Sequence, residues 1–247
     1  MNNVNDTYFD GYYKDMWKAI IPAQLTEKEV DFMIPYFHLR PGSHVLDLMC
    51  GYGRHAIALA RKGIKVTAVD NLPEYVNEIK EIAGKENLSI NAVQAGVLDF
   101  TSKENFDLVI CMGNSINFFD AADTQKIFRN ISTFLKSGGH LLINTWSIAE
   151  IAIKNFKETA TSQVDGKNFT VESKFLFHPA RIEAEHTITT ADGEKEVKKG
   201  IDYIFSINEL EWMLKEAGLL LKEVYSIPGR KEFTIGEPRA YLVAEKL

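Results

Sequence analysis

Residues 43–60 read SHVLDLMCGYGRHAIALA, and this stretch decides the fold. Its largely apolar run Val45–Leu48 is typical of a buried parallel strand. The glycine turn Gly51–Gly53 follows, and from Ala56 onward apolar residues recur at helical spacing. A strand, a glycine-rich turn and a helix in this order let the backbone approach a nucleotide-like ligand and point a helix N-terminus at it.

Two carboxylates narrow the identity of that ligand. Asp70 lies 23 residues after Asp47 and ends a second apolar strand, where it can accept hydrogen bonds from both ribose hydroxyls of an adenosine. Asp47 stands four residues before Gly51. A carboxylate there would repel a pyrophosphate but attract a ligand that carries an ammonium and a sulfonium. S-adenosylmethionine (SAM) carries both groups.

At these residues the sequence resembles the Rossmann-like (class I) SAM-dependent methyltransferases, whose first motif reads approximately D-x-G-x-G-x-G. Asp47, Gly51 and Gly53 match this motif. Met49 stands at the first glycine position, which is compatible with the motif if its side chain points away from the ligand. The resemblance implies that Asp47 holds the methionine amino group and that the two glycines admit the cofactor backbone.

The resemblance also assigns contacts along the other strand ends. It implies that Asp70 binds the ribose. Further cofactor contacts are expected at Cys50, Asn71, Leu72, Val97, Leu98, Met112 and Gly113. The family's adenine-binding acid falls on Gly96 here. The adenine contact would then come from a backbone carbonyl or from Asp99 in a shifted loop, unless Asp99 only caps that loop.

The segment after the fourth expected strand, residues 109–119 (VICMGNSINFF), bears on the substrate class. It resembles the fourth motif of the small-molecule N-methyltransferases related to glycine N-methyltransferase. It does not resemble the (N/D)-P-P-(Y/F) motif of enzymes that methylate amino groups of DNA and RNA. The resemblance implies a small-molecule acceptor, with an amine as one candidate. Asn114 and Asn117 fit either a ligand contact or turn chemistry alone.

The catalytic residue is not assigned by the sequence. Methyl transfer from a sulfonium depends mainly on proximity and alignment, and a base is needed only if the acceptor must lose a proton. The sequence shows no Ser-His-Asp order, which disfavours hydrolases. The candidates for contact with the reacting group are Tyr12, Tyr13, Asn117 and Trp146.

The order of expected elements predicts an α/β fold with a doubly wound, mostly parallel seven-stranded sheet. We expect its strands at about residues 44–48, 65–70, 89–95, 106–112, 140–146, 219–226 and 240–244. The connection 228–238 is too short for a crossover helix, so the last strand should be antiparallel.

Three parts are expected along the chain. Residues 1–40 would form an N-terminal helical cap, which packs against the sheet edge or covers the ligand. In that cap, Thr26 and Glu29 have the spacing of a capping box. Residues 41–150 and 206–247 would form the SAM-binding domain. Residues 151–205 alternate apolar and polar residues between Asp-Gly turns, which predicts a small inserted antiparallel β subdomain.

Composition excludes several classes of protein. The net charge of −6 argues against nucleic-acid binding as the main task. Two cysteines provide no disulfide framework, and no signal peptide or 18-residue apolar run is visible, so we expect a cytoplasmic protein without a membrane partner. Six histidines lack metal-ligand spacing, so no metal is expected. A monomer and a homodimer are equally compatible with the sequence.

Two other functions stay open at this point. The first is a catalytically inert SAM-binding module, because Met49 and Gly96 depart from the family's motifs. The second is an NAD(P)-dependent oxidoreductase, which the position of Asp47 and the antiparallel last strand disfavour.

Overall fold

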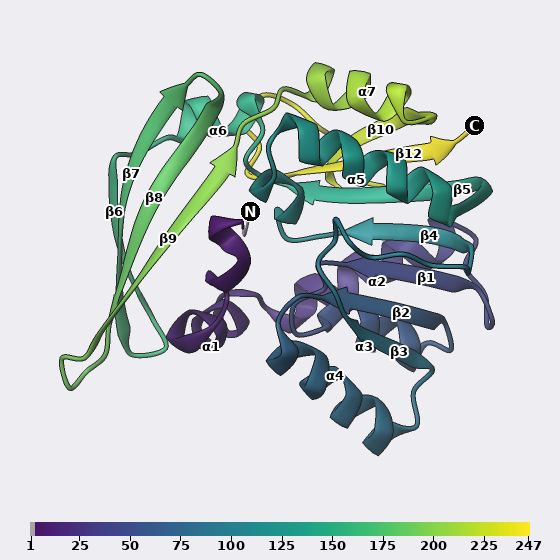
Figure 1. Cartoon of the computed structure of the whole chain (residues 1–247), viewed down its shortest axis with the longest axis horizontal. Coiled ribbons are helices and arrows are strands. Elements are labelled where there is room, and N and C mark those ends of the chain that lie inside the picture. Colours follow the sequence, from purple (N-terminus) through teal and green to yellow (C-terminus); the bar gives the residue numbers. More distant parts are fainter. Residues whose placement is uncertain (1–2) are drawn as a thin grey trace.

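A computed structural model of the chain describes residues 3–247 and contains two β-sheets (Figure 1). The larger sheet has the strand order β11-β10-β12-β5-β4-β1-β2-β3. Its strands are β1 (His44–Leu48), β2 (Lys65–Asp70), β3 (Ile90–Gln94), β4 (Phe106–Cys111), β5 (Leu135–Thr145), β10 (Leu219–Ile227), β11 (Lys231–Glu232) and β12 (Ala240–Lys246).

The pairing of these strands confirms a mostly parallel α/β sheet with an antiparallel last strand. β1 pairs in parallel with β2 and β4, and β2–β3 and β4–β5 are parallel as well. β12 lies between β5 and β10 and is antiparallel to both. The sheet has eight strands where seven were expected, because residues 231–232 fold back along β10 as a short edge strand.

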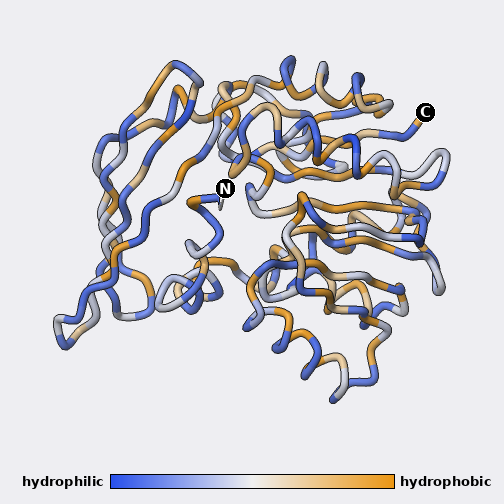
Figure 2. Tube along the Cα trace, in the orientation of Figure 1, coloured by the Kyte–Doolittle hydropathy of each residue, from blue (hydrophilic) through white to orange (hydrophobic). Residues whose placement is uncertain are grey.

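Helices cover both faces of the central sheet because successive strand residues point to opposite sides. Val45 packs with α2 (Ala23–Tyr36), α3 (Arg54–Arg61) and α4 (Pro73–Glu86). Its neighbour Leu46 packs on the other face with α5 (Ala121–Phe134) and α7 (Ile207–Glu216). Apolar colour concentrates in the central strands and thins out in the second sheet (Figure 2).

The second sheet is antiparallel and has the order β6-β7-β8-β9. Its strands are β6 (Thr159–Val164), β7 (Lys167–Phe177), β8 (Ala180–Thr189) and β9 (Lys195–Tyr203), and they follow the short helix α6 (Ala149–Asn155). Asp165 and Gly166 have φ values of 49° and 72°, as the expected two-residue hairpin turn requires.

The N-terminal segment lies between the two sheets (Figure 1). It consists of the 3₁₀ helix η1 (Val4–Thr7) and the helix α1 (Gly11–Ile20). Tyr8, Tyr13 and Met16 pack with Ile188 of β8 in a small apolar cluster. Of the expected cap, residues 8–16 therefore cover the second sheet and not the edge of the central sheet, whereas α2 packs on a face of the central sheet.

The start of α2 and the start of β5 differ from expectation, and α4 ends in a left-handed residue. α2 begins at Ala23, so Thr26 is a buried residue inside the helix and the capping box was wrong. α4 ends at Glu86, and the following residue Asn87 adopts a left-handed conformation with φ of 52°. β5 begins at Leu135, earlier than the expected start at about residue 140. No helix among residues 3–247 combines the length and apolar character needed to cross a membrane.

Candidate active site

A cavity of about 450 Å³ opens at the carboxyl ends of β1, β2 and β4, where ligands bind in open α/β sheets. The structure brings all but one of the expected cofactor residues to its wall. These residues are Asp47, Cys50, Gly51, Asp70, Asn71, Leu72, Val97, Leu98, Met112 and Gly113. They come from four separate strand ends and their following loops.

Gly53 is the expected cofactor residue that does not line the cavity. It adopts φ of 75°, and a Cβ at this position would lie 2.6 Å from Cγ1 of Ile79 in α4. Gly53 therefore lets α3 pack closely against α4, and its expected contact with the cofactor stays a prediction. Gly51 differs, because a Cβ there would meet no atom within 4 Å and its open side faces the cavity.

Asp47 presents an unsatisfied carboxylate oxygen. Its side chain is buried in the cavity wall, and Oδ2 has no hydrogen-bond partner among the described residues. Burial raises the pKa of Asp47 to about 7, although the charge of Arg54 opposes this rise. A buried acceptor without a partner is costly, so this atom fits a donor supplied by a ligand.

Asp70 is held in place by the backbone of the neighbouring loops. Its Oδ2 accepts a hydrogen bond from Gly51 N at 2.7 Å, and its Oδ1 accepts one from Leu72 N at 3.0 Å. Each carboxylate oxygen has a further lone pair available. The side chain can therefore accept two hydroxyl donors while it fixes the glycine loop.

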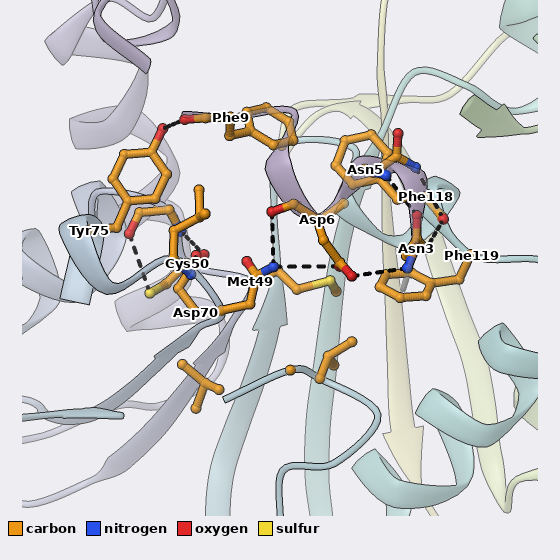
Figure 3. A pocket seen from close by; sticks show the side chains of 18 of the residues that line it. Asn3, Asn5, Asp6, Phe9, Met49, Cys50, Asp70, Tyr75, Phe118 and Phe119 are labelled. Atoms are coloured by element: carbon orange, nitrogen blue, oxygen red, sulfur yellow. Dashed lines mark hydrogen bonds between the residues drawn. The ribbon is translucent and has the colours of Figure 1, made fainter. Parts of the chain in front are cut away.

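Met49 occupies the first glycine position of the motif and adopts φ of 54°, in the left-handed region that normally favours glycine. Its side chain lines the cavity (Figure 3). The sequence made the fit of Met49 to the motif conditional on a side chain that points away from the ligand, and the structure places this side chain at the cavity wall. The thioether adds an apolar surface there.

Gly96 leaves space beside the loop that follows β3. Asp99 lines the cavity together with Val97 and Leu98. Its Oδ2 lies 3.6 Å from the position that a Cβ of Gly96 would occupy. The carboxylate of Asp99 thus lies next to the place where the family's motif has its acid.

A buried ionic network beneath the cavity was not foreseen from the sequence. Arg54 lines the cavity, and its Nη1 donates to Glu29 Oε2 at 2.6 Å and to Thr26 Oγ1 at 2.8 Å. His55 Nε2 lies 2.8 Å from the same oxygen of Glu29. One feature of the sequence pointed to it. Arg54 is a basic residue at the first position of α3, where its charge opposes the helix dipole, so a separate interaction must stabilise it there.

The N-terminal segment forms one wall of the cavity (Figure 3). Asn3 Nδ2 donates to Phe118 O at 2.8 Å. Asn71 Nδ2 donates to Asp6 O at 3.2 Å, so this expected cofactor residue also ties η1 to the end of β2. The ring of Phe9 contacts that of Phe118 with centroids 5.3 Å apart. No spacing pattern in the sequence predicts these long-range contacts.

The structure separates the four catalytic candidates. The Tyr12 hydroxyl donates to Glu194 at 2.7 Å on the β8–β9 hairpin, away from the cavity. Asn117 is fully buried and donates to Ser147 O and Tyr203 O, which is a structural role. The Asn117 amide is thus used inside the fold, whereas the Tyr12 hydroxyl is used in an exposed contact, and none of the four candidates is among the residues that line the cavity. Tyr13 and Trp146 both lie close to Trp17, with ring centroids 6.4 and 6.0 Å away.

Comparison with known proteins agrees with this geometry. Residues 45–139 match the family described as "Methyltransferase domain". The ubiquinone biosynthesis O-methyltransferase of Rickettsia typhi is 30% identical over 173 residues, which cover 69% of this chain and 67% of that enzyme. The glycine/sarcosine N-methyltransferase of Aphanothece halophytica is 26% identical, and the alignment covers 71% of this chain and 67% of that enzyme.

A solved structure shows the same fold over nearly the whole chain. It is an S-adenosylmethionine-dependent methyltransferase from Clostridium acetobutylicum, with a TM-score of 0.80, 19% identity, and coverage of 95% of this chain and 96% of that one. The chain therefore belongs to the SAM-dependent methyltransferase family. SAM is the cofactor of this class of enzyme.

Proposed function

We propose that this protein transfers the methyl group of SAM to a small-molecule acceptor. The observation that carries the proposal is the unpartnered Oδ2 of Asp47 on the wall of a cavity that Asp70 also lines. This arrangement offers one buried acceptor for an ammonium group and a separate carboxylate for two hydroxyls. A pyrophosphate would be repelled by both, which disfavours a dinucleotide.

The charge of the cavity supports a cationic cofactor. Six acidic side chains line it, against Arg54 and His55 as basic residues: Asp6, Asp47, Asp70, Asp99, Asp120 and Asp123. In the proposed assignment Asp47 holds the amino group, Asp70 holds the ribose, and Asp99 accepts from the adenine amino group in place of an acid at Gly96. Met112 and Gly113 line the side that faces the acceptor.

For methyl transfer from SAM, the main task of the protein is to align the two reactants. SAM supplies an activated methyl group, which is transferred by in-line displacement at carbon. Fixed orientation of the reactants can account for roughly 7 to 11 kcal/mol of the barrier. The η1 segment contributes by excluding water, because it covers the cavity between Asn71 and Phe118.

Calorimetric titration with S-adenosylhomocysteine and with NADH tests the cofactor assignment. We expect binding of the first ligand only, and Asp70→Ala should weaken it by about 100-fold or more, since charge-assisted hydrogen bonds are lost. Asp31→Ala is the matched control, because Asp31 is an exposed aspartate on α2. Unchanged affinity in Asp70→Ala, or binding of NADH alone, would refute the assignment.

A further inference from the structure

Asp202 is a carboxylate without a cationic partner. It lies near the end of β9, where its Oδ1 accepts a hydrogen bond from Asn114 Nδ2 at 3.2 Å. No ion pair involving it is found within residues 3–247. An ionised carboxylate removed from water is costly unless a cation or hydrogen-bond donors compensate it. This arrangement favours a cation supplied from outside the chain.

The position of Asp202 is fixed relative to the cofactor cavity. Asn114 Oδ1 accepts from Trp146 N and Ser147 N, both at 2.9 Å. These two backbone donors determine which end of the amide is oxygen, so the Nδ2 group must face Asp202. Asn114 directly follows Gly113, which lines the cavity at the carboxyl end of β4. Asp202 is therefore hydrogen-bonded to the residue that follows this wall residue, and its chain neighbours Ile201 and Tyr203 line the cavity, although Asp202 itself is not among the lining residues.

Aromatic rings cover the same face of β9. Gly200 precedes Asp202 by two residues and so points to the same side of the strand. A Cβ at Gly200 would lie 2.9 Å from Cε2 of Tyr8, so the Tyr8 ring lies directly on this face. The Tyr8 ring in turn contacts Tyr13, with centroids 4.4 Å apart.

Contacts between aromatic rings connect Tyr8 to the cavity through Tyr13 and Trp17. Tyr13 stacks on Trp17 with an interplanar angle of 12°. Trp17 lines the cavity, and its Cζ2 lies 3.8 Å from the position that a Cβ of Gly113 would occupy. The ring of Trp146 is tilted by 44° against that of Trp17, with centroids 6.0 Å apart. Aromatic faces next to a carboxylate are a combination that recognises organic cations.

The protonation state of Asp202 suits exchange of a proton near neutral pH. Burial raises its pKa to about 7, and the Ser147 hydroxyl partly opposes that rise. A group with a pKa close to the working pH is an efficient proton acceptor. The phenols that face it, Tyr8 and Tyr13, have pKa values raised by burial and do not compete for this role.

We propose that Asp202 binds the methyl acceptor as a protonated amine between the rings of Trp17, Trp146 and Tyr13, and then removes one of its protons. This inference rests on the proposed methyl transfer. In the proton step one N–H bond of the ammonium breaks and one O–H bond forms on Asp202. The product is a neutral amine whose lone pair is free to attack, and the acceptor class is therefore an amine and not an alcohol.

Tryptophan fluorescence tests the inference without knowledge of the natural acceptor. The chain has three tryptophans, and Trp212 is 60% exposed, so Trp212→Phe leaves only Trp17 and Trp146 as reporters. In this background, saturated with S-adenosylhomocysteine, benzylamine and benzyl alcohol are titrated near neutral pH. We expect benzylamine to bind roughly tenfold or more tightly than benzyl alcohol, as a desolvated cation between rings and a carboxylate should.

Asp202→Asn keeps the acceptor for Asn114 and should abolish this preference while the alcohol is bound as before. Glu185→Gln, an exposed acid on the neighbouring strand, is the control that should change nothing. Equal affinity for the two probes, or a preference that survives Asp202→Asn, would overturn the inference. Binding of S-adenosylhomocysteine is measured in every variant: its absence in the unmodified protein would count against the proposed function instead.

Discussion

Arg54 Nη1 lies 2.6 Å from Glu29 Oε2, in an ion pair that joins the first helix after the glycine loop to α2. The Glu29 side chain is 2% exposed and also accepts a hydrogen bond from the Tyr241 hydroxyl at 2.7 Å. The pair therefore connects the cofactor loop, the N-terminal part of the chain and the last strand. Loop position and global stability are coupled through this one carboxylate.

Glu29→Gln should destabilise the protein by about 3 to 5 kcal/mol near neutral pH, because it leaves the Arg54 charge buried without a counter-charge. Chemical unfolding of both proteins measures this difference. Glu86→Gln is the control, because it breaks the exposed pair with Arg61 and should cost about 1 kcal/mol or less. Equal effects of the two variants would contradict the structural role of Glu29.

The Glu29 contribution should also depend on pH. Burial acts to raise its pKa, but the hydrogen bond and charge of His55 and the charge of Arg54 outweigh it and lower the pKa from 4.5 to about 2. A carboxyl group with a lowered folded-state pKa stabilises the fold above its unfolded pKa. The difference between the two proteins should therefore shrink as the pH falls from 4.5 toward 2, and a constant difference would refute the shift.

The two motif glycines should respond differently to alanine. Gly53→Ala places a methyl group 2.6 Å from Ile79 at positive φ, so the midpoint of unfolding should fall by the equivalent of about 1 to 3 kcal/mol. Gly51→Ala meets no atom of the described residues, so its stability cost is limited to the positive φ of 56°, about 1 kcal/mol, and cofactor affinity should fall more than stability. Thermal unfolding with and without S-adenosylhomocysteine separates the two effects, and identical behaviour would show that the two roles are not distinct.

Cofactor affinity should follow the ionisation of Asp47. Burial raises its pKa to about 7, and the carboxylate must be charged to hold an ammonium group. The affinity for S-adenosylhomocysteine should therefore fall by roughly tenfold between about pH 8 and about pH 6. Calorimetry across this range measures the effect. Asp47→Asn should bind weakly with a flat profile, whereas a persistent pH dependence would assign the titration to another group.

Asn5 should anchor the segment that covers the cavity. Its Nδ2 donates to Ile201 O and its Oδ1 accepts from Ile201 N, both at 2.9 Å. Asn5→Ala removes both bonds, so the Ile201 amide should exchange with solvent roughly tenfold faster. Hydrogen exchange followed by NMR measures this rate, with the exposed Asn168→Ala as the control. Unchanged protection at Ile201 would show that η1 is held by other contacts.

The local pattern of the sequence was sufficient for the central fold. Buried strands read as continuous apolar runs, and β1 and β2 have the expected residues. The antiparallel last strand followed from the length of one connection. Gly53 shows what a local pattern misses: motif spacing placed it at the cofactor, and only the close approach of Ile79 reveals its role in helix packing. The spacing of Thr26 and Glu29 likewise suggested a helix cap, although both side chains bind Arg54.

The sequence by itself determined the class of protein, because a strand, a glycine turn and a helix with Asp47 and Asp70 are a local arrangement. Only the tertiary structure decided which residues surround the proposed acceptor site. Asp202, Asn114 and Trp17 are far apart in the chain and are brought together by the packing of β9 and α1 at one end of the central sheet. Periodicity reports which residues are buried, whereas long-range packing decides which side chains meet.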